Sequence, residues 1–181
     1  MSTFLSPWMQ SKAPQLVLIF ITIIWGGSFL TVKYGLNFSS PILFVALRFA
    51  AAAIAVSIIS WRNLKGFNLK EIVAGACIGA VIAIGYGTQT VGLQTISSSE
   101  SAFLTALYVP LVPIFVWIIF KTKTHLMTWL GAGLAFIGLV FLTGNGFGSI
   151  QLNDGQILTL LGSIAIAFEI ILIGHFAGSV N

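Results

Sequence analysis

The sequence predicts an all-α integral membrane protein with about six transmembrane helices, and two observations support this. Uncharged, mostly apolar runs are long enough to cross a bilayer: 13–32 and 101–120 have 20 residues each, and 72–99 and 125–153 are longer. About 20 such residues, rising 1.5 Å each, span a hydrocarbon core of roughly 30 Å. In addition, 57% of residues are hydrophobic, only 7% are charged, and the mean hydropathy is +1.05. A soluble domain carries about 25% charged residues, so this class is excluded.

Six helices account for the apolar runs, in chain order. The expected ranges are 14–33, 41–61, 71–95, 100–120, 126–143 and 156–177. Pro14 and Pro41 suit the first turn of a helix, where the missing N–H of proline costs no hydrogen bond. The first run is longer than the apolar core of about 7–15 residues in a signal peptide, and no small-residue cleavage site closes it. We therefore expect it to be a retained first span.

The positions of Lys and Arg predict the orientation. One side of the expected ladder carries six basic residues: Lys12, Arg62, Lys65, Lys70, Lys121 and Lys123. The other side carries Lys33, together with Glu100 and Asp154. Because cytoplasmic loops are enriched in basic residues, residues 1–13 are expected in the cytoplasm and the Gly-rich loop 145–155 outside. In a bacterium the membrane would be the plasma (inner) membrane. The basic residues form no continuous patch, so no nucleic-acid partner is expected, and lipid is the expected surrounding.

Charged residues inside the spans are the sharpest functional candidates. Arg48 follows Pro41 by seven residues, about 10 Å from the outer end of its helix. Placing an arginine there costs about 2.5–3.5 kcal/mol, so it either snorkels outward, finds a partner such as Glu100, or meets a solute. Glu169 follows 14 uncharged residues of the last helix. It could carry a coupling proton, meet a cationic solute, or bond in neutral form to another helix. Lys33 ends the first span and could simply snorkel.

Aromatic and amide side chains predict a cavity. Trp25 falls near the midplane, Tyr86 and Tyr108 in the outer halves of their spans, and Gln89 three residues after Tyr86 on the same face. Such groups would suit an amphipathic organic solute, and packing between helices explains them equally well. The substrate-cavity candidates are thus Trp25, Arg48, Tyr86, Gln89, Tyr108 and Glu169.

Three further features concern packing. Pro110 and Pro113 are expected to kink the fourth helix, because each removes a helical hydrogen bond. Small residues at four-residue spacing predict a face for close helix contact: Gly75, Gly79, Ala83 and Gly87. The single cysteine, Cys77, is expected to be a small buried hydrophobe, and one cysteine excludes an intrachain disulfide.

No metal or cofactor is expected, because no HExxH, P-loop or Cys/His cluster is present.

Five helices precede the Gly-rich loop, so a second copy of them would insert upside down, as in inverted-repeat transporters. The segment from Gln156 faintly resembles the segment from Gln15.

Four stretches, in order, resemble the drug/metabolite transporter superfamily, EamA type: WGGSF from Trp25 to Phe29 with Lys33, the pair Arg48–Phe49, residues 92–113, and residues 129–144.

The resemblance implies ten helices in two inverted five-helix halves around a central cavity, with both termini cytoplasmic. It implies export or exchange of amino acids, metabolites or drugs, often linked to protons, with family roles for Trp25, Lys33, Arg48 and Pro110. Residues 14–144 would be one repeat, and 156–181 the first helix of a second, truncated repeat. The family more often has an aromatic or apolar residue at the place of Glu169, so no family role is transferred to it.

These observations favour transport of small organic solutes by alternating access, by a chain that could be a truncated or inactive N-terminal part. Two alternatives stay open: a half-transporter that forms a homodimer, and a membrane scaffold subunit that transports nothing. A membrane enzyme is the remotest class, because no catalytic motif such as GxSxG is present. Deep polar residues favour transport over a scaffold, which has no need of polar groups in hydrocarbon.

Overall fold

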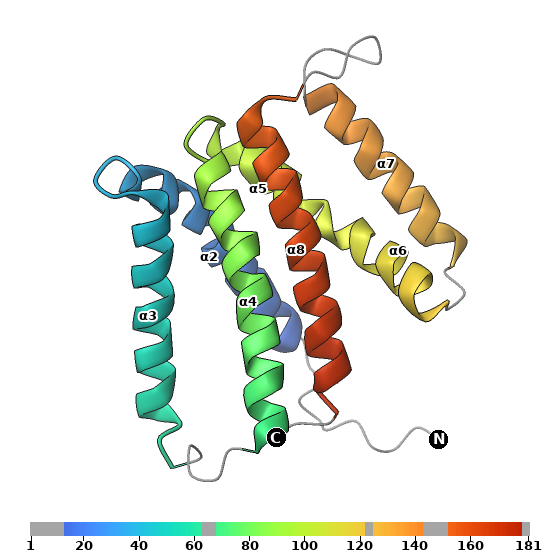
Figure 1. Ribbon diagram of the computed structural model, residues 1–181. Coiled ribbons are helices and arrows are strands. Elements are labelled where there is room, and N and C mark those ends of the chain that lie inside the picture. The colour runs from blue at the N-terminus through green and yellow to red at the C-terminus, as the bar shows by residue number, and fades with distance from the viewer. Residues whose placement is uncertain (1–12, 63–67, 122–124, 143–151, 179–181) are drawn as a thin grey trace.

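The computed structural model describes residues 13–62, 68–121, 125–142 and 152–178. Its helices are α2 (Ala13–Gly35), α3 (Pro41–Ile59), α4 (Leu69–Gly92), α5 (Ser98–Ala106), α6 (Tyr108–Phe120), α7 (Leu126–Leu142) and α8 (Asp154–Phe176) (Figure 1). Residues 1–12 and 145–151 lie outside the described residues, as do Lys12, Lys65 and Lys123, so the predictions that concern them have no structural counterpart here.

The six predicted helices are confirmed, with α5 and α6 together forming the fourth. Five segments are long and apolar enough to cross a membrane: Pro14–Gly35, Pro41–Ile59, Leu69–Gly92, Ser98–Phe120 and Asp154–Phe176. The sixth helix, α7, contains a shorter apolar stretch at Leu126–Ala135. The all-α, multi-pass membrane fold predicted from the sequence is therefore confirmed.

Capping side chains explain why two helices begin earlier than predicted. Asn68 and Glu71 form a reciprocal capping box at the start of α4, and Asn153 and Gln156 form another at the start of α8. In each box the two side chains satisfy backbone N–H groups that have no partner inside the helix. These boxes place the helix starts at residues 69 and 154, each two residues before the expected position.

The fourth span breaks at Leu107, between α5 and α6. Pro110 has no N–H for the carbonyl of Ala106, and its ring crowds that carbonyl. Leu107 lies between the two helices, and its N–H donates to the carbonyl oxygen of Leu104, three residues earlier, at 3.3 Å. Pro113 lies inside α6. The break lets α6 diverge from α5 towards α7, as Figure 1 shows.

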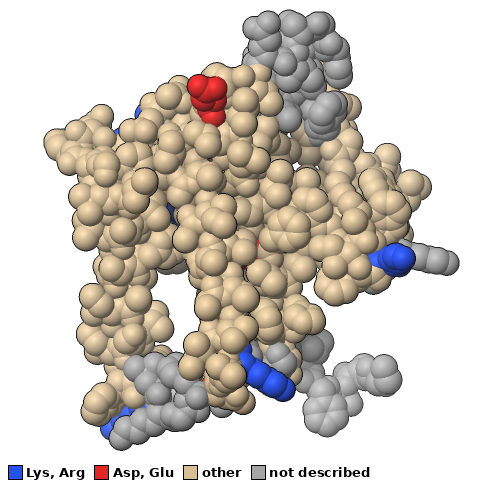
Figure 2. Space-filling model, viewed as in Figure 1, with Lys and Arg blue, Asp and Glu red and all other residues tan. Residues whose placement is uncertain are grey.

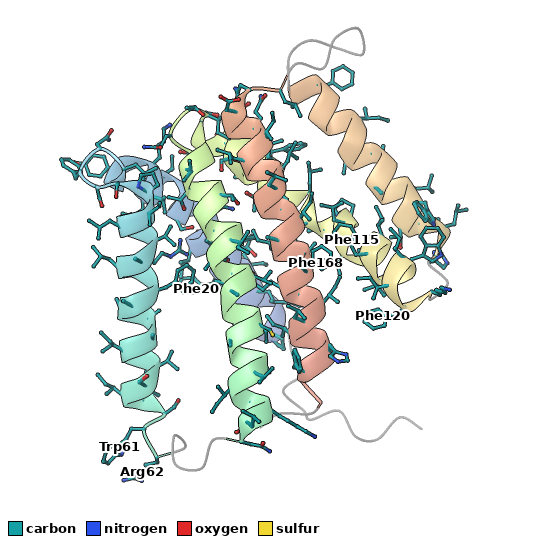
Figure 3. The ribbon with its side chains drawn as sticks, in the orientation of Figure 1. Phe20, Trp61, Arg62, Phe115, Phe120 and Phe168 are labelled. Carbon is teal, nitrogen blue, oxygen red and sulfur yellow. The ribbon has the colours of Figure 1, made fainter. Side chains whose placement is uncertain are left out.

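Successive spans run in opposite directions, which separates the charged residues by side (Figure 1). Arg62 follows α3 and lies with Trp61 at its free lower end (Figure 3), and Lys70 begins α4 at the same end. Lys33 ends α2 and Asp154 begins α8 at the opposite end. On the face shown in Figure 2, acidic atoms lie at the upper end and the largest basic groups lie lower down.

Helices α4 and α8 pack side by side at the centre, through glycines (Figure 1). A Cβ atom added to Gly92 would lie 2.6 Å from the carbonyl oxygen of Gly155, and one added to Gly162 would lie 2.8 Å from that of Gly85. Real Cβ atoms do not approach other atoms this closely. Only glycine at these positions allows the two backbones to approach so closely.

Two packing predictions are wrong for the described chain. The stripe of Gly75, Gly79 and Gly87 makes no close contact, because an added Cβ would meet nothing within 4 Å. Instead, Gly79 and Gly87 line an open groove of about 540 Å³ between α3 and α4. Cys77 is exposed rather than buried. Helix α4 turns its other small residues, Gly85 and Gly92, towards α8, and this stripe borders the open groove beside α3.

Candidate functional site

The candidate site begins where α2 meets α6. The rings of Trp25 and Tyr108 lie 6.0 Å apart between centroids, tilted at 57°. Trp25 also lines a cavity of about 280 Å³ together with Ile21, Ile24, Ser28 and Arg48. Two predicted cavity residues, Trp25 and Arg48, therefore border one space, and a third, Tyr108, contacts the Trp25 ring.

Arg48 reaches from α3 towards aromatic rings. Its guanidinium carbon lies 5.4 Å from the ring centroid of Tyr86 and 5.8 Å from that of Phe49. The rings of Tyr86 and Phe49 meet edge to face at 5.5 Å. A guanidinium within about 6 Å of an aromatic face is attracted by the ring quadrupole, worth about 0.5–2 kcal/mol depending on desolvation. The aromatic faces thus partly offset the cost of placing Arg48 inside a span.

The suggested pairing of Arg48 with Glu100 is not formed between these two described side chains. A carboxylate oxygen of Glu100 instead accepts a hydrogen bond from the Nε2 of Gln156, which joins α5 to α8. Glu100 therefore ties the start of α5 to the start of α8.

Glu169 approaches the same region from α8. It is half-buried and lies within electrostatic range of Tyr86, as do Arg48 and Tyr108. Next to Glu169, Phe168 stacks on Phe115 of α6 at 4.8 Å between centroids (Figure 3). We call Trp25, Arg48, Tyr86, Tyr108 and Glu169 the aromatic–charge cluster. Its members come from five helices, so the fold gathers them from separate parts of the sequence.

Two predicted residues lie elsewhere. Gln89 is buried, with 8% exposure, and its Nε2 donates to the Thr105 Oγ1 at 2.8 Å, between α4 and α5. Lys33 donates to backbone carbonyls at the end of α4. Both side chains thus make bonds between helices, away from the aromatic–charge cluster.

Sequence reasoning missed several contacts around the cluster. Phe49 lies under the Arg48 guanidinium, and Ser28 lines the cavity beside Trp25. Both stood within the quoted motifs, but nothing in their type marked them as site residues. On α8, buried small residues recur every four positions: Gly155, Thr159, Ser163 and Ala167. That spacing is visible in the sequence and could have identified the face of α8 that packs on α4.

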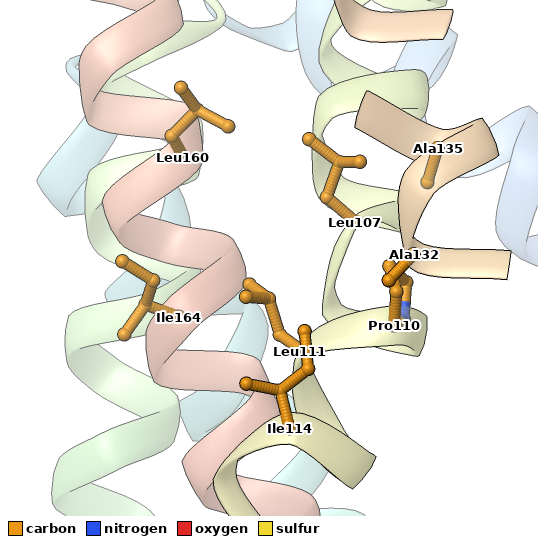
Figure 4. Close-up of a pocket in the computed structure, with 8 residues that line it drawn as sticks. All are labelled: Leu107, Pro110, Leu111, Ile114, Ala132, Ala135, Leu160 and Ile164. Carbon is orange, nitrogen blue, oxygen red and sulfur yellow. The ribbon is translucent and has the colours of Figure 1, made fainter. Parts of the chain in front are cut away.

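A second cavity, of about 390 Å³, lies between α6, α7 and α8 (Figure 4). Its eight lining residues are apolar: Leu107, Pro110, Leu111, Ile114, Ala132, Ala135, Leu160 and Ile164. A cavity without a polar group offers no handle for orienting a polar solute. Within the residues that the structure describes, no group of three His, Cys, Asp or Glu side chains could hold a metal ion.

The aromatic–charge cluster has the chemical groups that an organic ion requires. Aromatic faces provide apolar contact area, Arg48 can pair with a carboxylate, and Glu169 can pair with an amine or hold a proton. This combination of apolar walls and a few polar handles is typical of small-molecule sites.

Comparison with known proteins identifies the family. A sequence profile of the EamA-like transporter family matches residues 13–144. A protein of Archaeoglobus fulgidus named as an uncharacterized transporter is 35% identical over 164 residues, which cover 90% of this chain and 49% of that protein. The uncharacterized inner membrane transporter YedA of Escherichia coli K12 is 30% identical over 151 residues, 81% of this chain and 48% of that protein.

A third relative, the uncharacterized transporter YvbV of Bacillus subtilis, is 26% identical over 84% of this chain and 50% of its own length. The chain spans about half the length of these curated relatives. No solved structure matches. The apolar helices, their order and the extent of the profile match agree, and the chain belongs to the EamA-like transporter family.

Proposed function

We propose that this chain forms one half of an alternating-access transporter that exports or exchanges small organic solutes such as amino acids, metabolites or drugs. The aromatic–charge cluster is the observation that carries the proposal. A polar cluster with an open cavity beside it, on helices apolar enough to span a membrane, is costly unless a solute or ion uses it. Alternating access needs two halves that move around a shared site, and in vesicles that hold this chain alone a second copy would supply the other half.

Each member of the cluster has a proposed role. Trp25, Tyr86 and Tyr108 supply the walls on which the apolar part of the solute lies. Arg48 binds an anionic group of the solute, because its guanidinium is held by aromatic faces and leaves its N–H donors available. Glu169 carries the coupling proton, since a half-buried carboxylate on a span is suited to proton exchange.

The proposed orientation has the N-terminus in the cytoplasm. Arg62, Lys70 and Lys121 adjoin the ends of α3, α4 and α6 on one side, and Lys33 is the one basic residue of the described chain at the other. The positive-inside rule favours the side with more basic residues as the cytoplasmic one.

Solute exchange in reconstituted vesicles tests the proposal. Vesicles containing the chain are preloaded with a mixture of unlabelled amino acids, and entry of each radiolabelled amino acid is measured. We expect exchange above the level of empty vesicles for at least one solute, and a loss of about tenfold or more in Arg48→Leu. Arg62→Leu, at the free end of the same helix, is the matched control and should keep wild-type exchange.

The alternatives give different results. A scaffold gives no exchange for any solute in the panel, which overturns the proposal. If two copies of the chain supply the two halves, the exchange rate per chain rises steeply with the protein density in the vesicles. Equal loss in Arg48→Leu and Arg62→Leu would contradict the role assigned to Arg48.

A further inference from the structure

The ammonium group of Lys33 is fully hydrogen-bonded, although it lies outside the aromatic–charge cluster. Its Nζ donates to the carbonyl oxygens of Leu93 at 2.6 Å, Gln94 at 3.1 Å and Ile96 at 2.9 Å. A lysine ammonium has three N–H donors and no acceptor. The three carbonyls therefore satisfy all of its donors, in the way that a shell of oxygens surrounds a bound cation.

These carbonyls are preorganised by the turn between α4 and α5, which runs from residue 93 to 97. The turn directly follows the C-terminal end of α4, where the negative end of the helix dipole favours a cation. No other donor in the described part of the chain bonds to these three oxygens. The side chains of Leu93 and Ile96 are 2% and 3% exposed, which holds the turn in place, and Gln94 is exposed, which leaves one side open.

We propose that this turn is a monovalent-cation site that the chain fills with its own lysine. Carbonyl oxygens that replace the hydration shell of an ion are the ligands of potassium in selectivity filters. An ammonium ion carries the same charge and donates to the same oxygens. Each nitrogen of an arginine guanidinium carries at most two N–H groups in a planar fork, so none of them can donate to all three oxygens as the lysine Nζ does.

The filled site makes Lys33 a positioning residue for α2. Among the described residues of α2, only Phe29 and Val32 are buried, at 7% and 8% exposure, so few packing contacts hold this helix. Trp25, Phe29, Val32 and Lys33 follow the spacing of one helix face. Trp25 lies eight residues before Lys33, about 12 Å along the axis. The bound ammonium therefore fixes the face that presents Trp25 to Tyr108.

Ion-specific rescue of a Lys33→Ala variant tests the site. The purified 181-residue chain in detergent is heated in choline, potassium or ammonium chloride at one ionic strength, and the unfolding midpoint is measured. In choline we expect Lys33→Ala to unfold about 5 °C below wild type, from the loss of charge-assisted hydrogen bonds. Potassium or ammonium should restore at least half of this loss, because either ion can enter the emptied site.

Three controls separate a cation site from a general effect of charge. Wild type and Lys70→Ala, an exposed lysine at the other end of α4, should show no difference between potassium or ammonium and choline. Lys33→Arg keeps the charge, and its midpoint should stay below wild type in every salt. A Lys33→Ala variant that folds only in ammonium would support the site.

Two results would overturn the proposal: a wild-type midpoint for Lys33→Ala in choline, or identical midpoints for this variant in all three salts. Failure of the variant to fold in any of them counts against the site as well, because a free ammonium ion should replace the tethered one. None of these outcomes depends on whether the chain transports a solute, so this test and the vesicle assay succeed or fail separately.

Discussion

Tyr86 and Gln89 lie three residues apart on α4 and occupy different environments. Tyr86 faces α3, where its ring meets Phe49 and the Arg48 guanidinium. Gln89 is buried against α5 and donates to Thr105. Three residues of an α-helix differ by about 60° around its axis, which suffices to turn one side chain to a different neighbour. In lipid a buried amide must find a partner within the protein, and Gln89 has done so.

Replacing Gln89 should therefore affect stability rather than solute recognition. We expect Gln89→Met to lower the free energy of unfolding by about 0.5–1.5 kcal/mol, because the bond to Thr105 is lost. The measurement is thermal unfolding in detergent, with solute exchange assayed in parallel. Gln94→Met, the same change at an exposed position, should be neutral. A loss of exchange in Gln89→Met without loss of stability would return this residue to the solute site.

The residue types and their depth in the predicted spans were enough to nominate Trp25, Arg48, Tyr86 and Tyr108. The fold pairs Trp25 with Tyr108 and Arg48 with Tyr86, and Trp25 and Arg48 border the same cavity. The partner of Lys33 could not be predicted. Its acceptors lie 60 or more positions away and are backbone carbonyls, which nearly every residue possesses. Only the turn that gathers three of them distinguishes these carbonyls from others. The Arg48–Glu100 pairing failed for a similar reason, since Gln156 reaches Glu100 from a helix far along the chain.

At the scale of elements, the contact between α4 and α8 organises the centre of the molecule. Gly85 and Gly92 on α4 meet Gly162 and Gly155 on α8. Ser163 ties α8 to α5 as well, because its hydroxyl donates to the carbonyl oxygen of Leu104 at 2.7 Å. Close approach of backbones is a main source of attraction between helices in lipid, where apolar burial provides little. Helix α8 is accordingly the most buried of the candidate spans: 28% of its most apolar 18-residue stretch is buried, against 11% or less in the others.

A methyl group at Gly92 should separate these two helices. The new Cβ of Gly92→Ala would lie 2.6 Å from both the Gly155 carbonyl oxygen and the Thr159 hydroxyl oxygen. We expect a destabilisation of about 1–3 kcal/mol, measured by thermal unfolding. Gly79→Ala is the matched control on the same helix, where nothing lies within 4 Å of the new atom. It should be neutral or stabilising by up to about 1 kcal/mol. Equal effects at both positions would contradict the contact described here.

The existence and order of the helices followed from apolar length alone, but three details did not. The capping boxes at Asn68 and Asn153 moved two helix starts, because side chains and not hydropathy decide where a helix begins. The break at Leu107 precedes Pro110, since a proline disturbs the turn before it. Helix α4 carries small residues on two faces, and the sequence of α4 does not say which face α8 covers.

At the scale of the whole molecule, the chain is a ladder of antiparallel spans. Of its described basic residues, Arg62, Lys70 and Lys121 lie at one end and Lys33 at the other. The count of Lys and Arg predicted this separation, because alternating spans place every second loop on the same side. What the sequence could not provide is the gathering of five helices around one aromatic–charge cluster. That arrangement depends on contacts between segments far apart in the chain, such as Trp25 with Tyr108.

Thiol labelling in intact cells tests the membrane topology of these spans most directly. Single cysteines replace Asn37, between α2 and α3, and Arg62, after α3, in a Cys77→Ser background; both positions are exposed. The account predicts that a membrane-impermeant maleimide labels Asn37→Cys from outside and labels Arg62→Cys only after the membrane is permeabilised. Labelling of both positions from the same side, or of Arg62→Cys alone from outside, would contradict it.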